Sequence, residues 1–256
     1  MSKFQKLIYK LKQKVATSED LANSEVARSY YADSNTAAVL LSSFGLPLSS
    51  DGESFYLTTE ETEIANQEFC FVDIETNGSN PAKHQIIEIA AIKTKGNVII
   101  DSMETLVYCN DVSVMISEIT GINCDELKDK PNEREVIEKF RSFLANSVFV
   151  AHNVDFDFGF LSQSMQKYDL PPLLNRKLCT INLAKRTIQA ERYGLKHLAE
   201  VLNLEGFLHH RAYSDTLASF EVFKRSLENI PADVKTVEQL IDFSTLKPVI
   251  TEGQEA

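Results

Sequence analysis

The sequence predicts an α/β protein, with a mixed sheet flanked by helices and a small, mainly helical domain at the N-terminus. Three strand-like segments follow one another at residues 69–75, 85–95 and 97–108. A further apolar strand at 147–151 stands between two segments of helical periodicity. Strands that come first in the chain, followed by helices around a later strand, are typical of a mixed α/β sheet.

The length and composition indicate one full domain and a smaller one. The chain has 256 residues, of which 43% are apolar and 25% are charged, which is ordinary for a folded protein. We expect an N-terminal domain over 1–66, the main domain over 67–230 and a C-terminal tail over 231–256. There is no run of roughly 18 apolar residues and no secretory signal, so we expect a cytoplasmic protein without a membrane partner.

The cysteine pattern agrees with a reducing compartment. The four cysteines are widely separated and form no C-x-x-C pair: Cys70, Cys109, Cys124 and Cys179. Free thiols are therefore expected, and a zinc site is not.

The first block reads as helices followed by a turn and a strand. Near the N-terminus, apolar side chains recur at helical spacing among lysines: Phe4, Leu7, Ile8, Leu11 and Val15. Residues 20–22 and 36–44 read as further helices, 45–52 as a turn and 54–59 as a short strand. This order suits a small winged-helix-like unit. The basic first helix either contacts DNA, lipid or a protein partner, or packs on its neighbours with a solvated lysine face.

Local signals also mark elements of the main domain. Residues 60–66 are polar and acidic and form the connector. Lys95-Gly96-Asn97 is a short, glycine-containing turn of the kind that joins two strands of a hairpin. A capping box at 132–135 begins a helix, whose apolar face is formed by Val136, Ile137, Phe140, Phe143 and Leu144.

The C-terminal third is helical. The pattern at 180–227 is interrupted at Gly194 and Gly206, and Pro231 ends the last long helix. The tail contains Gln-Leu-Ile-Asp-Phe at 239–243, which resembles the peptide that docks on bacterial sliding clamps but has an aspartate at an apolar position. A short helix that packs on the domain is the alternative.

The most informative segment is Phe71-Val-Asp-Ile-Glu-Thr-Asn-Gly78, which places Asp73 and Glu75 two residues apart in an apolar run. In a β-strand, both carboxylates project from the same face. Two anions about 7 Å apart repel each other, and a divalent cation held by oxygen ligands relieves that repulsion. The alternative is an edge strand whose polar face meets solvent.

Two later segments bring further polar residues in a recognisable order. His152-Asn153 ends the apolar strand and Asp157 follows, while His210 stands five residues before Asp215. The order D-x-E, H-N-x-x-F-D and H-x4-D resembles the DnaQ-like exonucleases with a DEDDh site, the family of the proofreading epsilon subunit of bacterial DNA polymerase III. The resemblance runs from about 68 to 227, includes Ile-Thr-Gly-Ile at 119–122, and implies a ribonuclease-H-like exonuclease fold.

The resemblance implies a two-metal site for phosphodiester hydrolysis. Two Mg²⁺ or Mn²⁺ ions would bind to four carboxylates, with the first as the bridge: Asp73, Glu75, Asp157 and Asp215. His210 would be the general base, because imidazole titrates near neutral pH. His209 and Asp155 are adjacent rivals, but the family spacing matches His210 and Asp157.

The same resemblance places Thr76, Asn77 and Gly78 against the terminal nucleotide of the substrate. Asn153 either contacts the substrate strand or stabilises the strand-to-helix turn. Glu88 lies in an apolar strand, where it either makes a structural hydrogen bond or supports the metal site from behind. Structural roles are expected for two other histidines, His84 and His197.

The resemblance implies a metal-dependent 3′→5′ exonuclease that releases nucleoside 5′-monophosphates from DNA, in proofreading or repair. An RNA-trimming exoribonuclease of the same fold and an inactive nuclease fold that scaffolds a polymerase are the alternatives. The net charge of −11 opposes a long duplex-binding groove. We therefore expect nucleic acid 3′ ends, single-stranded or frayed, as the substrate and a replicative polymerase or sliding clamp as the partner.

Overall fold

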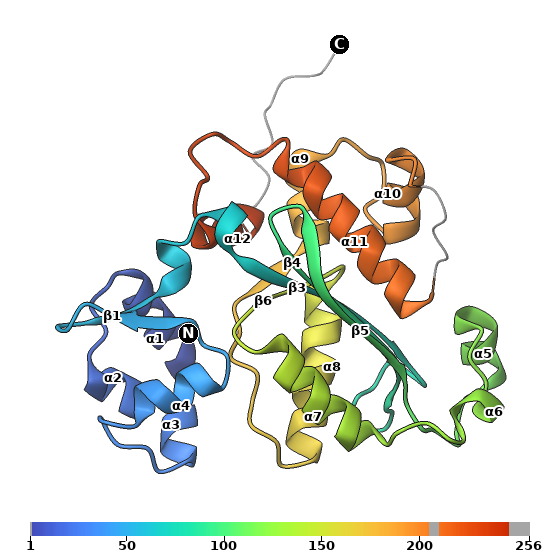
Figure 1. Ribbon diagram of the computed structural model, residues 1–256, viewed down its shortest axis with the longest axis horizontal. Helices are drawn as coiled ribbons and strands as arrows, with labels where there is room; N and C mark the ends of the chain where they lie inside the picture. The colour runs from blue at the N-terminus through green and yellow to red at the C-terminus, as the bar shows by residue number, and fades with distance from the viewer. Residues whose placement is uncertain (1, 205–209, 246–256) are drawn as a thin grey trace.

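The computed structural model describes residues 2–204 and 210–245 (Figure 1). Its centre is a five-stranded sheet in the order β5-β4-β3-β6-β7. The strands are β3 (Glu68–Thr76), β4 (Ile86–Lys95), β5 (Val98–Leu106), β6 (Val148–Ala151) and β7 (Lys177–Cys179). The first three pair antiparallel, whereas β6 pairs parallel with both β3 and β7. The mixed sheet expected from the sequence is confirmed.

The local sequence explains the meander of β3, β4 and β5. β4 is apolar and buried along most of its length, while β5 is an edge strand and largely exposed. Lys95 pairs with Val98, so the hairpin closes through Gly96 and Asn97. Gly96 has a φ of +57°, which glycine adopts without a steric cost. The predicted hairpin turn is confirmed.

Helices cover both faces of the sheet (Figure 1). One face is covered by α7 (Glu133–Leu144) and α8 (Val154–Lys167). The other is covered by α9 (Thr180–Thr187), α11 (Ala212–Leu227) and α12 (Val237–Thr245). α10 (Leu195–Val201) packs on α11, and α5 (Val114–Thr120) and α6 (Cys124–Leu127) connect β5 to α7. Asn132 caps α7, since its side chain accepts the amide of Glu135 at 3.1 Å, which is one of the two bonds of the predicted capping box.

The alternation of β3 decides which way the first two acidic residues point. Cys70 belongs to the core beneath α7 and α8, whereas Phe69 and Phe71 pack against α11. Side chains two residues apart in a strand share a face. Asp73 and Glu75 therefore lie on the face that α11 covers.

The N-terminal block (Figure 1) packs around an apolar core that also includes Leu174 of the main domain. It contains α1 (Lys3–Lys12), α2 (Ser18–Ala22), α3 (Glu25–Ser29), α4 (Ala37–Ser43), β1 (Leu48–Ser50) and β2 (Phe55–Leu57). The helices expected at 20–22 and 36–44 and the strand at 54–59 are confirmed. α3 and β1 were not predicted, because β1 has three residues and is stabilised by pairing with β2 rather than by a pattern of its own. The winged-helix-like interpretation stays a prediction.

The segment at 239–243 lies in α12, which confirms the short packing helix. Leu240 and Ile241 are buried against the sheet. Gln239 accepts the backbone amides of Lys235 and Thr236 at the start of the helix. These side chains are engaged within the protein and do not present a clamp-binding peptide. The expected helix break at Gly206 lies outside the described residues.

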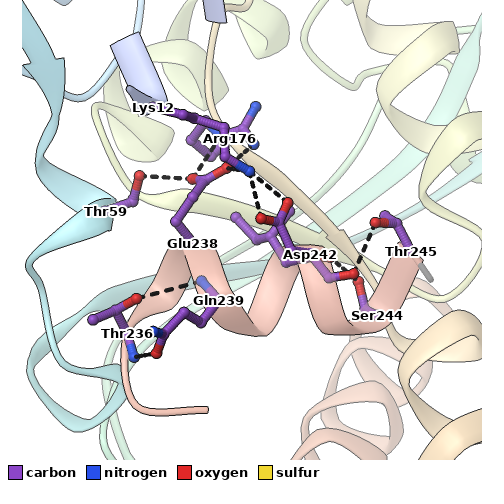
Figure 2. Close-up of polar contacts among 10 residues, drawn as sticks. Lys12, Thr59, Arg176, Thr236, Glu238, Gln239, Asp242, Ser244 and Thr245 are labelled. Carbon is purple, nitrogen blue, oxygen red and sulfur yellow. Dashed lines mark hydrogen bonds and ion pairs between the residues drawn. The ribbon is translucent and has the colours of Figure 1, made fainter. Parts of the chain in front are cut away.

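A buried carboxylate joins the N-terminal block to α12 (Figure 2). The side chain of Glu238 is 1% exposed and accepts hydrogen bonds from Thr59 at 2.9 Å and from Nε of Arg176 at 3.0 Å. The ammonium of Lys12 lies 3.4 Å from the same carboxylate and also bonds Asp242. Burial acts to raise the pKa of Glu238, but its cationic and hydroxyl partners hold that pKa below its ordinary value. The two parts of the chain are thus joined by ionic contacts between a buried carboxylate and partly exposed cations.

None of the helices in the described ranges has the length and apolar character needed to cross a bilayer.

Replacing Glu238 with alanine should destabilise the fold by about 3–5 kcal/mol, because the change leaves the partly buried Arg176 without its anion and leaves Lys12 with Asp242 alone. Urea denaturation of the full chain measures this loss. Asp125→Ala is the matched control, since it removes an exposed ion pair to Lys128 whose contribution is about 0–1 kcal/mol. Equal effects of the two substitutions would contradict the importance of the Glu238 cluster.

Candidate active site

The site begins at the C-terminal end of β3. Asp73 and Glu75 are half-buried there, on the face of the sheet that α11 covers. The pairing of β3 with β4 shifts between Glu75 and Thr76, where Glu75 is opposite Glu88 but Thr76 is opposite Ile86. Such a bulge bends the strand and redirects its side chains. Both carboxylates therefore project from one face of the strand, as predicted, and they do so where the strand ends in a bulge.

The second element delivers Asp157 from the first turn of α8. The chain enters this helix through Asn153, whose φ of +83° is left-handed and allows a sharp reversal after β6. Asp157 is 4% exposed. Burial raises the pKa of its carboxyl to about 8, although the backbone at Asp157 itself and at Ile74 acts to lower that pKa. Asp157 therefore lies close to β3 and to the first two carboxylates.

The third element is the start of α11, which brings His210 and Asp215 to Glu75. Ligand atoms of these three residues all lie within 4.8 Å of one another. The backbone N–H of His210 donates to the Asp215 carboxylate at 3.2 Å. His210 has a φ of +64°, a left-handed backbone two residues before the first residue of α11. The rival His209 lies outside the described residues.

Burial and mutual repulsion shape the electrostatics of the four carboxylates. Burial, together with the charges of Asp215 and Glu88, raises the pKa of Glu75 to about 8. Burial also raises the pKa of Asp215 to about 6, although the backbone and charge of His210 act to lower it. Burial and neighbouring carboxylates raise the pKa of both Asp73 and Asp157. The charged forms of this cluster therefore need a positive partner.

The donor set fits divalent cations that prefer oxygen ligands. Burial raises the pKa of Asp73 most, and the charges of Asp157, Asp215, Glu75 and Glu88 raise it further, so these carboxylates lie near one another. Carboxylates with one adjacent imidazole suit Mg²⁺ or Mn²⁺ better than a soft metal that prefers thiolates. The structure places ligand atoms of Glu75, His210 and Asp215 within 4.8 Å of one another, and Asp73 and Asp157 are close enough for their charges to act on the same cluster.

The residues expected at the substrate also shape the turn after β3. The Thr76 hydroxyl donates to the Gly78 carbonyl at 3.0 Å. The Asn77 side chain donates to the Asp111 carbonyl at 2.7 Å and accepts the Gln85 amide at 2.7 Å. These bonds fix the segment that leaves Glu75. Contact of the turn residues and of Asn153 with a nucleotide stays a prediction.

Four other polar residues have structural contacts outside the carboxylate cluster. His152 bonds Thr180 at 2.8 Å and the Tyr193 carbonyl at 2.9 Å, which ties the end of β6 to the α9 region. Asp155 pairs with Lys177 on the surface, as expected of a solvated helix-start residue. The structural roles expected of two histidines agree with the turn contact of His84 and with the position of His197 near Glu200.

Sequence reasoning missed Arg211. Its guanidinium makes a two-pronged contact with Glu88, the carboxylate for which a partner was expected but not identified. The two residues are 123 positions apart in the chain, so no local pattern could have joined them. The signal that could have suggested a pairing is an arginine directly after the predicted catalytic histidine.

Comparison with known proteins finds a matching exonuclease family and several similar polymerases. Residues 70–223 match the RNase T family model, which is described as Exonuclease. The chain is 34% identical over 196 residues to a PolC-type DNA polymerase III of Thermotoga petrophila, covering 73% of this chain and 14% of the relative. The corresponding protein of Thermotoga maritima is 32% identical over 230 residues, covering 86% and 17%. This chain therefore spans about one seventh of the length of the first relative and about one sixth of the second.

Solved structures share the fold. A zinc-bound complex of Escherichia coli exonuclease I with single-stranded DNA has a TM-score of 0.60 and 21% identity, over 70% of this chain and 42% of that one. Exonuclease X in complex with 5′-overhanging duplex DNA has a TM-score of 0.52 and 25% identity, over 69% and 99%. The expected ribonuclease-H-like fold is confirmed, as is the resemblance to the DnaQ-like exonucleases. The family match covers more than half of the sequence, and this chain therefore belongs to the exonuclease family.

Proposed function

We propose that this protein is a metal-dependent 3′→5′ exodeoxyribonuclease, which hydrolyses the terminal phosphodiester of a DNA strand and releases nucleoside 5′-monophosphates. The observation that carries the proposal is the convergence of four carboxylates and His210 at the end of β3. Grouping like charges away from water costs stability. An arrangement that is costly for the fold but suited to phosphodiester hydrolysis supports a catalytic purpose.

The carboxylates would hold two divalent cations, Mg²⁺ or Mn²⁺. Bound cations would lower the pKa of the attacking water and stabilise the leaving oxygen. Asp73 and Glu75 come from a strand, whereas Asp157 and Asp215 come from the first turns of two helices. Rigid elements on three sides therefore fix the spacing of the ligands before a substrate arrives.

His210 would accept the proton of the attacking water at an imidazole nitrogen. Imidazole titrates near neutral pH, where it accepts and releases a proton readily. The bond from the His210 backbone to Asp215 fixes the residue beside the carboxylates. Thr76, Asn77, Gly78 and Asn153 would meet the terminal nucleotide, because they border the cluster at the ends of β3 and β6.

The names of the relatives favour DNA as the substrate and a polymerase as the context. The curated relatives are PolC-type DNA polymerases III, and the solved neighbours are described in complexes with single-stranded or overhanging DNA. We propose proofreading or repair trimming beside a replicative polymerase. The alternative substrate, RNA, is decided by comparing matched DNA and RNA strands.

Removing one carboxylate should abolish hydrolysis while the fold persists. Asp73→Ala and Asp215→Ala each delete a cation ligand and relieve repulsion, so circular dichroism and thermal melting should show a folded protein. His210→Ala should lower the rate by about 10²–10⁴, the scale of a general base. Release of mononucleotides from a 3′-labelled strand with Mg²⁺ measures both effects.

Asp155→Ala is the matched control for these variants, because Asp155 is an exposed carboxylate two residues from Asp157. It should keep wild-type activity. Near wild-type hydrolysis by Asp73→Ala would refute the two-metal assignment. A loss of activity in His209→Ala, with none in His210→Ala, would transfer the role of the base to His209.

Without metal, the protein should lose stability as the pH rises. Folding raises the pKa of Glu75 to about 8, so the proton it retains stabilises the folded state and that contribution is lost as pH rises through this value. In EDTA, the melting temperature should be lower at about pH 9 than at about pH 6, and Mg²⁺ should restore most of the loss.

Other groups also titrate in this range, so Glu75→Gln is the reference protein. This variant keeps the shape of the side chain but cannot ionise. It should show a smaller fall in melting temperature and a weaker response to Mg²⁺. An identical response of both proteins to pH and Mg²⁺ would contradict the cluster as the source of the effect.

The isolated protein should act distributively and prefer unpaired 3′ ends. Its net charge is −11, so the surface repels the flanking backbone and affinity comes mainly from the metal site and the last nucleotides. Labelled strand is bound first, Mg²⁺ and excess unlabelled strand are added together, and product lengths are read. Removal of about ten or more nucleotides per encounter would oppose distributive action. Equal rates on paired and mispaired ends would oppose the preference.

A further inference from the structure

Glu88 is a buried carboxylate directly behind the proposed catalytic site. It lies in β4 among apolar residues, and its side chain is 1% exposed. The sheet register places it opposite Glu75, and residues opposite each other in a sheet project from the same face. A carboxylate in such a place needs strong partners, because it has given up its contacts with water.

Both partners of Glu88 come from the start of α11. The Arg211 guanidinium donates to Oε1 through Nε at 3.2 Å and through a terminal nitrogen at 2.8 Å. The backbone amide of Ala212 donates to Oε2 at 2.9 Å. Arg211 is the residue that precedes the helix, and its backbone is extended. Two consecutive residues of the chain are therefore fastened to one side chain of β4.

Arg211 and Ala212 lie between His210 and Asp215 in the chain. His210 comes directly before Arg211, and its backbone N–H bonds Asp215. The amide of Asp215 in turn donates to the Arg211 carbonyl at 3.0 Å. Glu75 is thus linked to Glu88 by strand pairing, and Glu88 is linked to Arg211 by hydrogen bonds. Arg211 follows His210 in the chain, and His210 and Asp215 in turn lie beside Glu75.

The charges of the pair act on the same cluster. In addition to burial and Asp215, Glu88 raises the pKa of Glu75, while Arg211 lowers it. Arg211 thus offsets the fifth negative charge that Glu88 would add beside the four carboxylates and His210. The pair can hold α11 in place without adding net charge to the site.

We propose that Glu88 and Arg211 are positioning residues, which fasten the start of α11 to β4 and so set where His210 and Asp215 stand relative to Glu75. This role rests on the proposed exonuclease function. It assigns Glu88 a part in the reaction that acts through its neighbours and not through contact with substrate.

The test compares Glu88→Gln and Arg211→Lys with a matched variant, Glu238→Gln. Glu238 is also a buried carboxylate with a two-pronged arginine partner, but it lies in α12 and outside the site. All three variants should lose some thermal stability. Glu88→Gln and Arg211→Lys should lower kcat about 10- to 100-fold with little change in KM, whereas Glu238→Gln should keep kcat.

Mn²⁺ binding is the readout that does not depend on catalysis. Titration of the full chain, followed by the electron paramagnetic resonance of free Mn²⁺, should show about tenfold weaker binding in Glu88→Gln and unchanged binding in Glu238→Gln. Folded Glu88 and Arg211 variants with wild-type kcat and wild-type Mn²⁺ affinity would overturn the positioning role. Should either variant fail to fold, the other decides.

The same experiment separates the two proposals. A wild-type protein that binds Mn²⁺ but hydrolyses no strand would refute the proposed function, and the Mn²⁺ affinities of the variants would still decide the positioning role. A wild-type protein that neither binds Mn²⁺ nor hydrolyses DNA would overturn both.

Discussion

Repulsion among carboxylates at the end of β3 is the constraint on which the rest of the structure depends. Asp73 and Glu75 share a face because side chains two residues apart in a strand point the same way. α8 and α11 then add Asp157 and Asp215. A cluster of this kind opposes folding, so its surroundings must be rigid. The phenylalanines of β3 and α11 supply that rigidity, since they pack in tilted and edge-on contacts with ring centroids 5.0–5.2 Å apart.

The sequence predicted those features that depend on neighbours along the chain. The spacing of Asp73 and Glu75, the glycine turn at Gly96 and the spacing of His210 and Asp215 are local, and the structure agrees with each of them. The fold class followed from the order of strands and helices. The fact that the four carboxylates belong together came from resemblance, because no local rule brings β3, α8 and α11 to one place.

The features that escaped prediction are those set by distant contacts. Arg211 and Glu88 are 123 positions apart, and Lys12 and Asp242 are 230 apart. In each case nothing in the local sequence identifies the ionic partner of the charged side chain, because folding alone brings the two residues together. Short elements such as β1 escaped for the same reason, since three residues gain their order from a partner strand.

The left-handed backbone at Asn153 and His210 has a consequence for how such proteins diverge. Each residue stands shortly before a helix of the site, and strain of this kind costs of order 1–3 kcal/mol for residues other than glycine. Asparagine and histidine tolerate this conformation better than β-branched residues do. A descendant that abandoned catalysis would therefore still be confined at position 210 to a short list, with glycine and asparagine first. The backbone conformation at this position would continue to restrict the residue type after the catalytic role had been lost.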